Sequence, residues 1–303
     1  MDAVVLVSGG AAITPFTSAD RAAGQGLAAG NTLTALRAHL RERHAAVFTA
    51  PARIGDGEVR EDAGWQGFSD VAEVLPAEMT VNAVGQIDAA GVRLAAFLRW
   101  LAEERGVSSV DLVAHSMGGL FCRAALRELG GTGPAVGRLV ALGTPWHGSL
   151  LGDLLTGEIT AADAHDDAPT LSILGAAPTY AAENSQGAAD QVSARFLGDW
   201  NAAQASILDD IDVTVIAGGH FDAHREPSSL WPHDGLVALR SALADDVPAT
   251  VLPRVRRHTV DGDVHSIFFA DGFGLPWERA LTWDPAVFAL VDSALAAPPP
   301  AGA

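Results

Sequence analysis

The chain has 303 residues, of which 49% are hydrophobic and only 18% are charged, so it can bury a large core and is not a disordered protein. Its net charge is −18, with arginine as the only strongly basic residue type, which argues against nucleic acids and anionic membranes as partners. The single cysteine, Cys122, excludes a disulfide framework and a cysteine-based metal site. These bounds favour one large α/β domain, or such a domain with a small cap.

The first residues run directly into an apolar segment, without the positively charged start and long apolar stretch of a signal peptide. No apolar run reaches about 18 residues, so the sequence predicts no transmembrane helix. We therefore expect a cytoplasmic protein, or a secreted one whose signal peptide is absent from this sequence. The proline-rich residues 296–303 are expected to form a disordered tail.

Strand-like and helix-like segments alternate along the chain, which predicts an α/β fold with a doubly wound, mostly parallel sheet covered by helices on both faces. The expected strands are residues 4–7, 45–49, 110–114, 138–142 and 212–217, and a last strand from Thr250 to Val255 or beyond. The expected helices are residues 31–43, with Asn31 as N-cap, and 86–105, 120–129, 150–155, 192–200 and 286–295. Residues 51–82 are expected to be irregular.

The predicted helix at residues 86–105 is amphipathic, since its apolar residues recur at helical spacing. Its buried face is expected to consist of Ile87, Val92, Leu94, Phe97, Leu98 and Leu101. The preceding helix is expected to bury Leu33, Leu36 and Leu40 in the same way.

A long insertion separates the strands at 138–142 and 212–217, and it consists of short apolar helices divided by Gly, Asp and Pro. Insertions of this length in a compact fold are usually functional. We therefore expect a core made of residues 1–150 and 206–295, with residues 151–205 inserted as a helical cap or lid.

The segment around Ser116 carries the strongest chemical signal, because a buried-strand pattern leads into it and a helix-forming pattern leads out. Strand, serine turn and helix form a nucleophile elbow, in which Gly118 leaves room for a sharp turn. The new helix places backbone N–H groups beside the serine, where they can stabilise an oxyanion. The sequence therefore predicts that Ser116 is a catalytic nucleophile.

A serine nucleophile needs a base, and the base needs a group that orients it; on such a turn the acid and then the histidine are expected later in the chain. His265 is the favoured base because it follows the last predicted strand, and His258 is the alternative. Asp234, followed by a glycine that permits a sharp turn, is the favoured acid, and Asp222 is the alternative.

Two backbone N–H groups are candidates for the oxyanion hole. One belongs to Met117, directly after the serine, and the other to Gly10 in the loop after the first strand, with Ala11 as the next choice. The histidines and acids elsewhere lack the spacing of a metal site, and no Gly-rich phosphate loop with a following lysine occurs, so we expect no metal and no cofactor.

Several of these segments resemble bacterial lipases and esterases of the α/β-hydrolase superfamily, from the first strand to about Phe268. The resemblance lies in residues 4–10, in the elbow at residues 110–119, in the Gly-Thr-Pro-Trp-His-Gly-Ser segment at 143–149 and in the His-Asp-Gly-Leu-Val segment at 233–237. The chain differs at Ser8, where many relatives have histidine, and at Ala114, where the strict elbow has glycine.

The resemblance implies an α/β-hydrolase fold and ester hydrolysis through an acyl-enzyme, with Ser116, Asp234 and His265 as the triad. It favours Asp234 over Asp222. The acyl group of a small-molecule or lipid ester is expected to contact a group of apolar residues, namely Trp146, Leu150, Leu151 and Leu154. An acyltransferase or thioesterase with the same triad is the alternative function, followed by a non-catalytic binding protein on the same fold.

Overall fold

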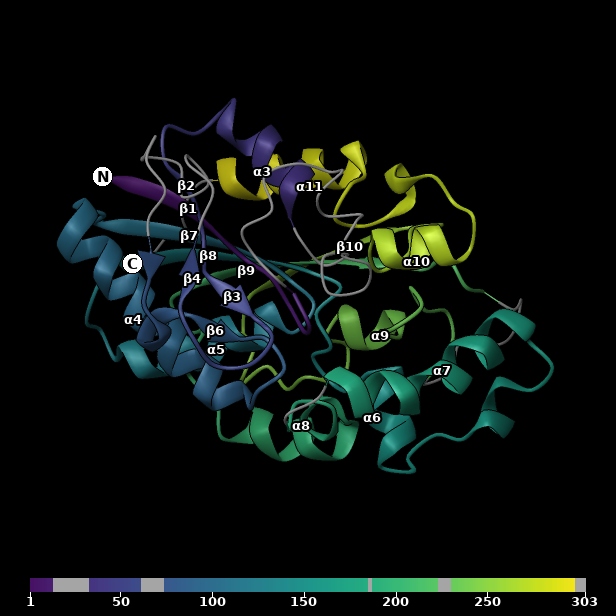
Figure 1. Ribbon diagram of the computed structural model, residues 1–303. Coiled ribbons are helices and arrows are strands. Elements are labelled where there is room, and N and C mark those ends of the chain that lie inside the picture. Colours follow the sequence, from purple (N-terminus) through teal and green to yellow (C-terminus); the bar gives the residue numbers. More distant parts are fainter. Residues whose placement is uncertain (13–32, 61–73, 185–186, 223–229, 298–303) are drawn as a thin grey trace.

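The computed structural model describes residues 1–12, 33–60, 74–184, 187–222 and 230–297. Its centre is a sheet of six parallel strands in the order β10-β9-β8-β7-β1-β2 (Figure 1). The strands are β1 (Asp2–Val7), β2 (Val47–Thr49), β7 (Ser109–His115), β8 (Ala135–Leu142), β9 (Asp212–Gly218) and β10 (Val255–Val260). Two small pairs lie outside this sheet: β3 (Ala52–Arg53) with β6 (Val81–Asn82), and β4 (Val59–Arg60) with β5 (Val74–Leu75).

Helices cover both faces of the sheet, as the alternating pattern predicts. One face carries α4 (Ile87–Arg105) and α5 (Gly118–Leu129), and the other carries α3 (Thr34–Arg41) and α11 (Pro285–Ala296), at the top of Figure 1. Because strand side chains alternate, Val5 and Val7 of β1 pack toward α4 and α5, whereas Val4 and Leu6 pack toward α3 and α11.

The order of the strands reverses at β1: β2 lies beside one edge of β1, whereas β7 and the later strands lie on the other side. This reversal of strand order is a topological switch point, and in open parallel sheets ligands bind beyond the carboxyl ends of the strands at such a point. The loop after β1 and the turn after β7 both lie there.

Helices α4 and α5 approach each other closely because Gly91 has no side chain. A Cβ atom at Gly91 would lie 2.4 Å from Cβ of Ala124. This contact fixes α5, and with it the turn from which α5 starts, against the rest of the molecule.

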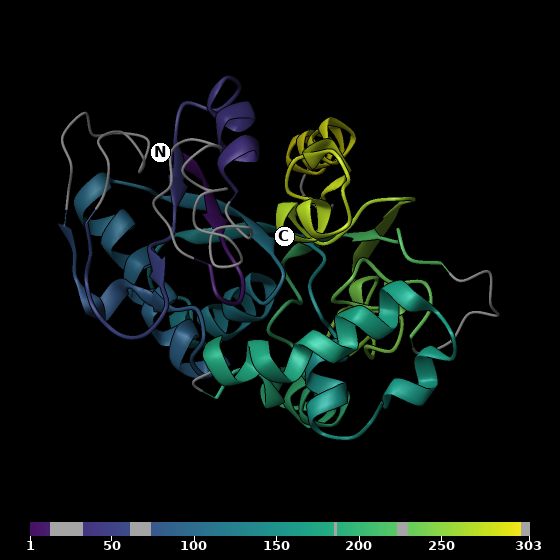
Figure 2. The ribbon, with the colours of Figure 1, turned by 45° about the vertical axis from the view of Figure 1, so that its right-hand side comes forward.

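The segment between β8 and β9 forms a group of helices in the lower part of Figures 1 and 2, and its residues Leu197 and Trp200 pack into the main core. It comprises α6 (Leu150–Leu155), α7 (Ala168–Asn184) and α8 (Ala194–Ala202), with 3₁₀ turns at Ala161–Ala164 and Asp190–Val192. Further short elements are the 3₁₀ turns Ala77–Met79 and Trp277–Arg279, and the helices α9 (Leu239–Ala242) and α10 (Ile267–Gly272). That the inserted helices act as a lid stays a prediction.

The last strand begins later than the sequence predicts, at Val255 and not at Thr250. The amides of Val251 and Leu252 donate to the carbonyl of Pro248 and form a turn, and Pro253 has no N–H to offer a sheet. Residues 51–82 are also less irregular than expected, since they contribute the four short strands β3 to β6.

The predicted helix faces are correct except at Val92, which is 50% exposed, while its five partners are fully buried. Val92 lies two residues from Leu94, about 200° around the helix, and therefore on the opposite side. Helix α3 begins at Thr34, and its expected N-cap Asn31 lies outside the described residues. Helix α11 includes Ala296, the first residue of the expected tail, of which residues 298–303 lie outside the described part.

In the described part of the chain, every helix is too short or too polar to cross a lipid bilayer.

Candidate active site

Ser116 occupies the sharp turn between β7 and α5. Its backbone has a φ of 56°, a left-handed conformation that non-glycine residues rarely adopt and that costs roughly 1–2 kcal/mol. The surrounding structure holds it there: its N–H donates to the carbonyl of Leu142 at 2.8 Å, and its carbonyl accepts from Oγ1 of Thr144 at 2.8 Å. Such strain at a serine is typical of a nucleophile elbow.

Glycines allow the loop after β1 to touch this turn. A Cβ atom at Gly118 would lie 2.4 Å from the carbonyl oxygen of Val7, and one at Gly9 would lie 2.5 Å from Cβ of Ser116. The sequence argument for a small residue at position 118 therefore has a physical reason, namely the close passage of the β1 strand end.

Asp234 and His265 form a buried pair. Nδ1 of His265 lies 2.7 Å from Oδ2 of Asp234, and the backbone N–H of His265 donates to the carbonyl of Asp234 at 2.8 Å. The other carboxylate oxygen, Oδ1, accepts from the N–H groups of Leu236 at 2.9 Å and Val237 at 2.7 Å. Asp234 is thus held in one orientation, and its remaining oxygen is directed at the imidazole.

This pair also determines the tautomer of the ring. The carboxylate oxygen accepts a hydrogen bond from Nδ1, which places Nε2 as the ring nitrogen that can take a proton from a nucleophile. Among the described residues Nε2 is buried and has no hydrogen-bond partner, and no hydrogen bond joins it to Oγ of Ser116. Catalytic hydrogen bonds are often long before substrate binds.

The end of β8 lies between the serine and the buried pair. Leu142 accepts the hydrogen bond from Ser116, and a Cβ atom at the next residue, Gly143, would lie 3.1 Å from Nδ1 of His265 and 3.2 Å from Oδ2 of Asp234. The three predicted triad residues are therefore gathered around the carboxyl end of this strand.

His115 also contacts the pair, a role that the sequence analysis missed. Its Nε2–H donates to the carbonyl of His265 at 2.9 Å, and the two ring centroids are 4.6 Å apart. Burial, and next the neighbouring His265, hold the pKa of His115 well below its usual value, so the ring is neutral. The only sequence signal was a histidine at the end of a buried strand, where its ring needs a partner.

The alternative residues lie elsewhere. Asp222 is exposed, and His258 lies within the edge strand β10. The structure therefore brings Asp234, and not Asp222, to His265.

The two oxyanion-hole candidates come from segments in contact. Met117 is the N-cap residue of α5, where the first N–H groups of a helix lack intrahelical partners. A Cβ atom at Gly10 would lie 3.0 Å from Sδ of Met117. Ala11, the next choice after Gly10, donates its N–H to the carbonyl of Ala83 at 3.0 Å.

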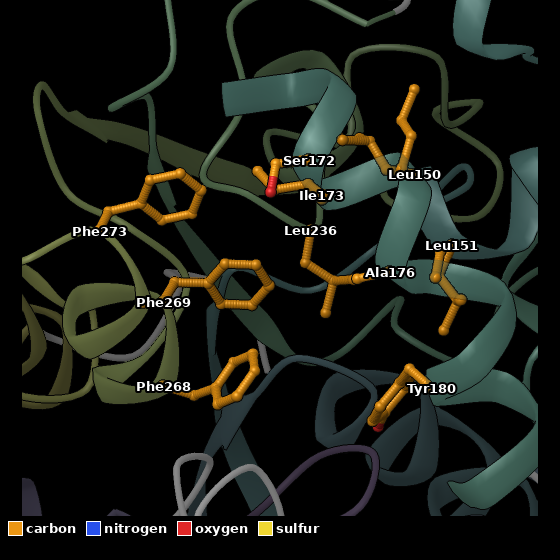
Figure 3. Close-up of a pocket in the computed structure, with 13 residues that line it drawn as sticks. Leu150, Leu151, Ser172, Ile173, Ala176, Tyr180, Leu236, Phe268, Phe269 and Phe273 are labelled. Carbon is orange, nitrogen blue, oxygen red and sulfur yellow. The ribbon is translucent and has the colours of Figure 1, made fainter. Parts of the chain in front are cut away.

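An apolar pocket of about 250 Å³ lies beside the buried pair (Figure 3). Phe269 joins the two, since it lines the pocket and its ring centroid is 6.1 Å from that of His265. The walls come from α6, α7, α10 and the loop of Asp234; the principal residues are Leu150, Leu151, Ile173, Ala176, Tyr180, Leu236, Phe268, Phe269 and Phe273.

Two of the four predicted substrate contacts, Leu150 and Leu151, line this pocket, and Leu154 and Trp146 do not. Trp146 is fully buried, with its ring 4.9 Å from the guanidinium carbon of Arg123. This cation–π contact stabilises the ring in that position. Contact of Trp146 with the substrate stays a prediction. Leu154 packs against neighbouring apolar clusters.

The aromatic wall of α10 was missed. Its signal was the Phe-Phe pair that begins three residues after His265.

Across the described ranges, no group of three or more His, Cys, Asp or Glu side chains is arranged to hold a metal ion.

No known family model matches the sequence, and no curated protein matches it. Solved structures are similar in fold. The product of gene lin2722 from Listeria innocua matches 99% of this chain and 95% of its own, with a TM-score of 0.53 and 16% identity. The mature lipase BlEst2 of Bacillus licheniformis matches 89% and 87%, with a TM-score of 0.50 and 17% identity. An esterase of Pyrobaculum calidifontis matches 96% and 75%, with a TM-score of 0.50 and 13% identity. The chain therefore has the α/β-hydrolase fold, as the resemblance implied.

Proposed function

We propose that this chain is a serine carboxylic-ester hydrolase with Ser116 as nucleophile, His265 as general base and Asp234 as the acid that orients the base. The observation that carries the proposal is the buried 2.7 Å contact between Asp234 and His265, which leaves Nε2 of the ring unpaired among the described residues, near a serine at positive φ. The esterase and lipase structures that share the fold are consistent with it.

The chemistry follows from the protonation of the ring. As Oγ of Ser116 attacks the ester carbonyl, Nε2 of His265 takes its proton, and Asp234 stabilises the imidazolium that forms. The carbonyl oxygen becomes an oxyanion, and the N–H groups of Met117 and Gly10 are the proposed donors to it.

Collapse of this intermediate breaks the bond to the alcohol, which leaves with the proton from Nε2. The acyl group then remains on Oγ of Ser116. Water attacks next, gives a proton to the same nitrogen and releases the carboxylic acid, which restores the serine.

The apolar pocket is the proposed site for the acyl group, because it adjoins His265 through Phe269 and its lining is mostly hydrocarbon. A lining of this kind favours a neutral apolar chain over a charged one. Residues 151–205 supply α7 and most of α6, so the expected cap would form one side of the substrate site.

The test is hydrolysis of p-nitrophenyl esters from acetate to palmitate by wild type and by Ser116→Ala, His265→Ala and Asp234→Asn. Each substitution is expected to lower kcat by about 10⁴-fold or more. Asp222→Asn, the matched control at the alternative acid, is expected to retain activity. A fluorophosphonate probe is expected to label wild type and not Ser116→Ala. Full activity of Ser116→Ala, or absence of wild-type activity on every ester, contradicts the proposal; added alcohol acceptors then test acyl transfer.

A further inference from the structure

His233 directly precedes Asp234 and is fully buried. It contacts the loop of Asp234, the start of α7, and Phe221, which leads to the end of α10. The backbone N–H of Gly235 donates to its Nδ1 at 3.1 Å, and its Nε2 lies 3.0 Å from Oγ1 of Thr170. Because Nδ1 accepts a hydrogen bond, the ring proton must be on Nε2, which donates to Thr170.

Thr170 extends this series of hydrogen bonds into the first turn of α7. Its hydroxyl donates to Oδ2 of Asp167 at 2.7 Å, and its backbone N–H donates to the same oxygen at 3.0 Å. In this series Gly235 donates, His233 and Thr170 each accept one hydrogen bond and donate onward, and the Asp167 carboxylate accepts at the end. The series fastens the start of α7 to the loop that carries the acid.

A second contact connects His233 to the opposite side. The ring of Phe221 stacks on that of His233 at 5.0 Å, and the ring of Phe273 meets Phe221 edge-on at 4.8 Å. Phe221 and His233 also exchange two backbone hydrogen bonds, of 2.9 and 3.0 Å. The residue that follows α10, Phe273, is thus also held relative to His233.

These two connections lead to the two walls of the apolar pocket. Figure 3 shows Phe268, Phe269 and Phe273 on one side and the α7 side chains, among them Ala176 and Tyr180, on the other. Leu236 lies between them, two residues after Asp234. The separation of the walls therefore depends on how α7 and α10 are each held at His233.

We propose that His233 and Thr170 are positioning residues that set the separation of the α7 and α10 walls and so determine which acyl groups the pocket accepts. The inference rests on the proposed function, because it takes the pocket to be the acyl site. The ligand class is an apolar monocarboxylic acyl group of short or medium length, since 250 Å³ lies just below the roughly 300 Å³ at which pockets for drug-sized ligands begin.

The test compares kcat/KM for p-nitrophenyl butyrate and octanoate in wild type, Thr170→Val and Thr170→Ser. Valine keeps the size and removes the hydroxyl, whereas serine keeps the hydroxyl. Thr170→Val is expected to change the octanoate-to-butyrate ratio by at least about fivefold, and Thr170→Ser to stay within about twofold of wild type. Thr282→Val is the matched control, because Thr282 is fully buried and its hydroxyl has no partner among the described residues.

A second arm does not depend on catalysis. Octanoate binding is measured by isothermal titration calorimetry in Ser116→Ala and in Ser116→Ala combined with Thr170→Val. A weaker affinity in the double variant supports the positioning role, even if wild type hydrolyses no ester and the proposed function fails. An unchanged chain-length ratio in an active, folded Thr170→Val protein overturns the inference and leaves the proposed function standing; so does equal octanoate affinity in the two Ser116→Ala proteins.

Discussion

Acidification is expected to destabilise the protein through His233. Burial lowers the pKa of His233 from its ordinary 6.5 to about 4, although the nearby Asp234 carboxylate acts in the opposite direction. In the unfolded chain the same histidine takes a proton near pH 6.5. Between pH 6.5 and about 4 the unfolded state therefore binds more protons than the native state, and the free energy of unfolding falls as pH falls.

The size of the effect follows from the two pKa values. They differ by about 2.5 units, and each unit is worth about 1.4 kcal/mol, so His233 is expected to remove about 3 kcal/mol of stability between pH 7 and pH 4. A domain is commonly stable by only about 5–15 kcal/mol, so this loss is measurable. Structurally, a proton on Nδ1 removes the acceptor that the N–H of Gly235 uses.

The assay is urea unfolding at several pH values between 4 and 7 for wild type and His233→Gln. His115, whose pKa is also lowered by burial, contributes equally to both proteins, so the difference between the two pH profiles isolates His233. The wild-type curve is expected to fall more steeply. Parallel curves, or an imidazole NMR titration of wild type that places the pKa of His233 near 6.5, would refute the reasoning.

Three further predictions concern stability. Gly91→Ala should lower the free energy of unfolding by about 1–3 kcal/mol, since its methyl would lie 2.4 Å from Cβ of Ala124. Gly175→Ala in α7, where the methyl meets open space, should raise the free energy of unfolding by about 0.5–1 kcal/mol in the same urea experiment. Burial, and next the Asp284 carboxylate, raise the pKa of Asp263 from 3.8 to about 8, so native stability should fall as pH rises across that range. Asp263→Asn, which cannot ionise, should gain stability relative to wild type between pH 5 and pH 9 in guanidinium unfolding.

The parts of the fold that local sequence determines were predicted well. β7, the serine turn and α5 follow one another in the chain, and each has its own pattern of strand, small residue or helix. The start of β10 was not, because Val251 and Leu252 fit a strand as well as a turn. In the structure both of their N–H groups bind the carbonyl of Pro248, Pro253 has no N–H to offer, and pairing with β9 begins at Val255.

The pocket was the part least accessible to sequence reasoning. Leu150 and Leu151 were found because they follow a motif, but their opposite wall is more than a hundred residues away in α10. Trp146 was assigned to the substrate because it lies within the same motif. Only the fold shows that its ring packs on the buried Arg123.

Sequence order alone also did not decide between Asp222 and Asp234 as the partner of His265. Both Asp222 and Asp234 follow β9, so strand order alone cannot separate them. The carboxylate of Asp234 has an oxygen for His265 because the N–H groups of Leu236 and Val237 bind the other oxygen. This arrangement needs the turn at Gly235, whose φ of 107° is a glycine conformation.

The residues directly after β8 connect the serine turn with the buried Asp–His pair. β8 lies between the strand that ends at the serine and the strand that precedes the acid, so whatever follows it must fit between them. Gly143 leaves space for Asp234 and His265, and its φ of 56° favours glycine. Thr144 binds the carbonyl of Ser116. Gly143 therefore leaves room for the buried Asp–His pair, and Thr144 holds the serine turn, so two adjacent residues connect the turn with the pair.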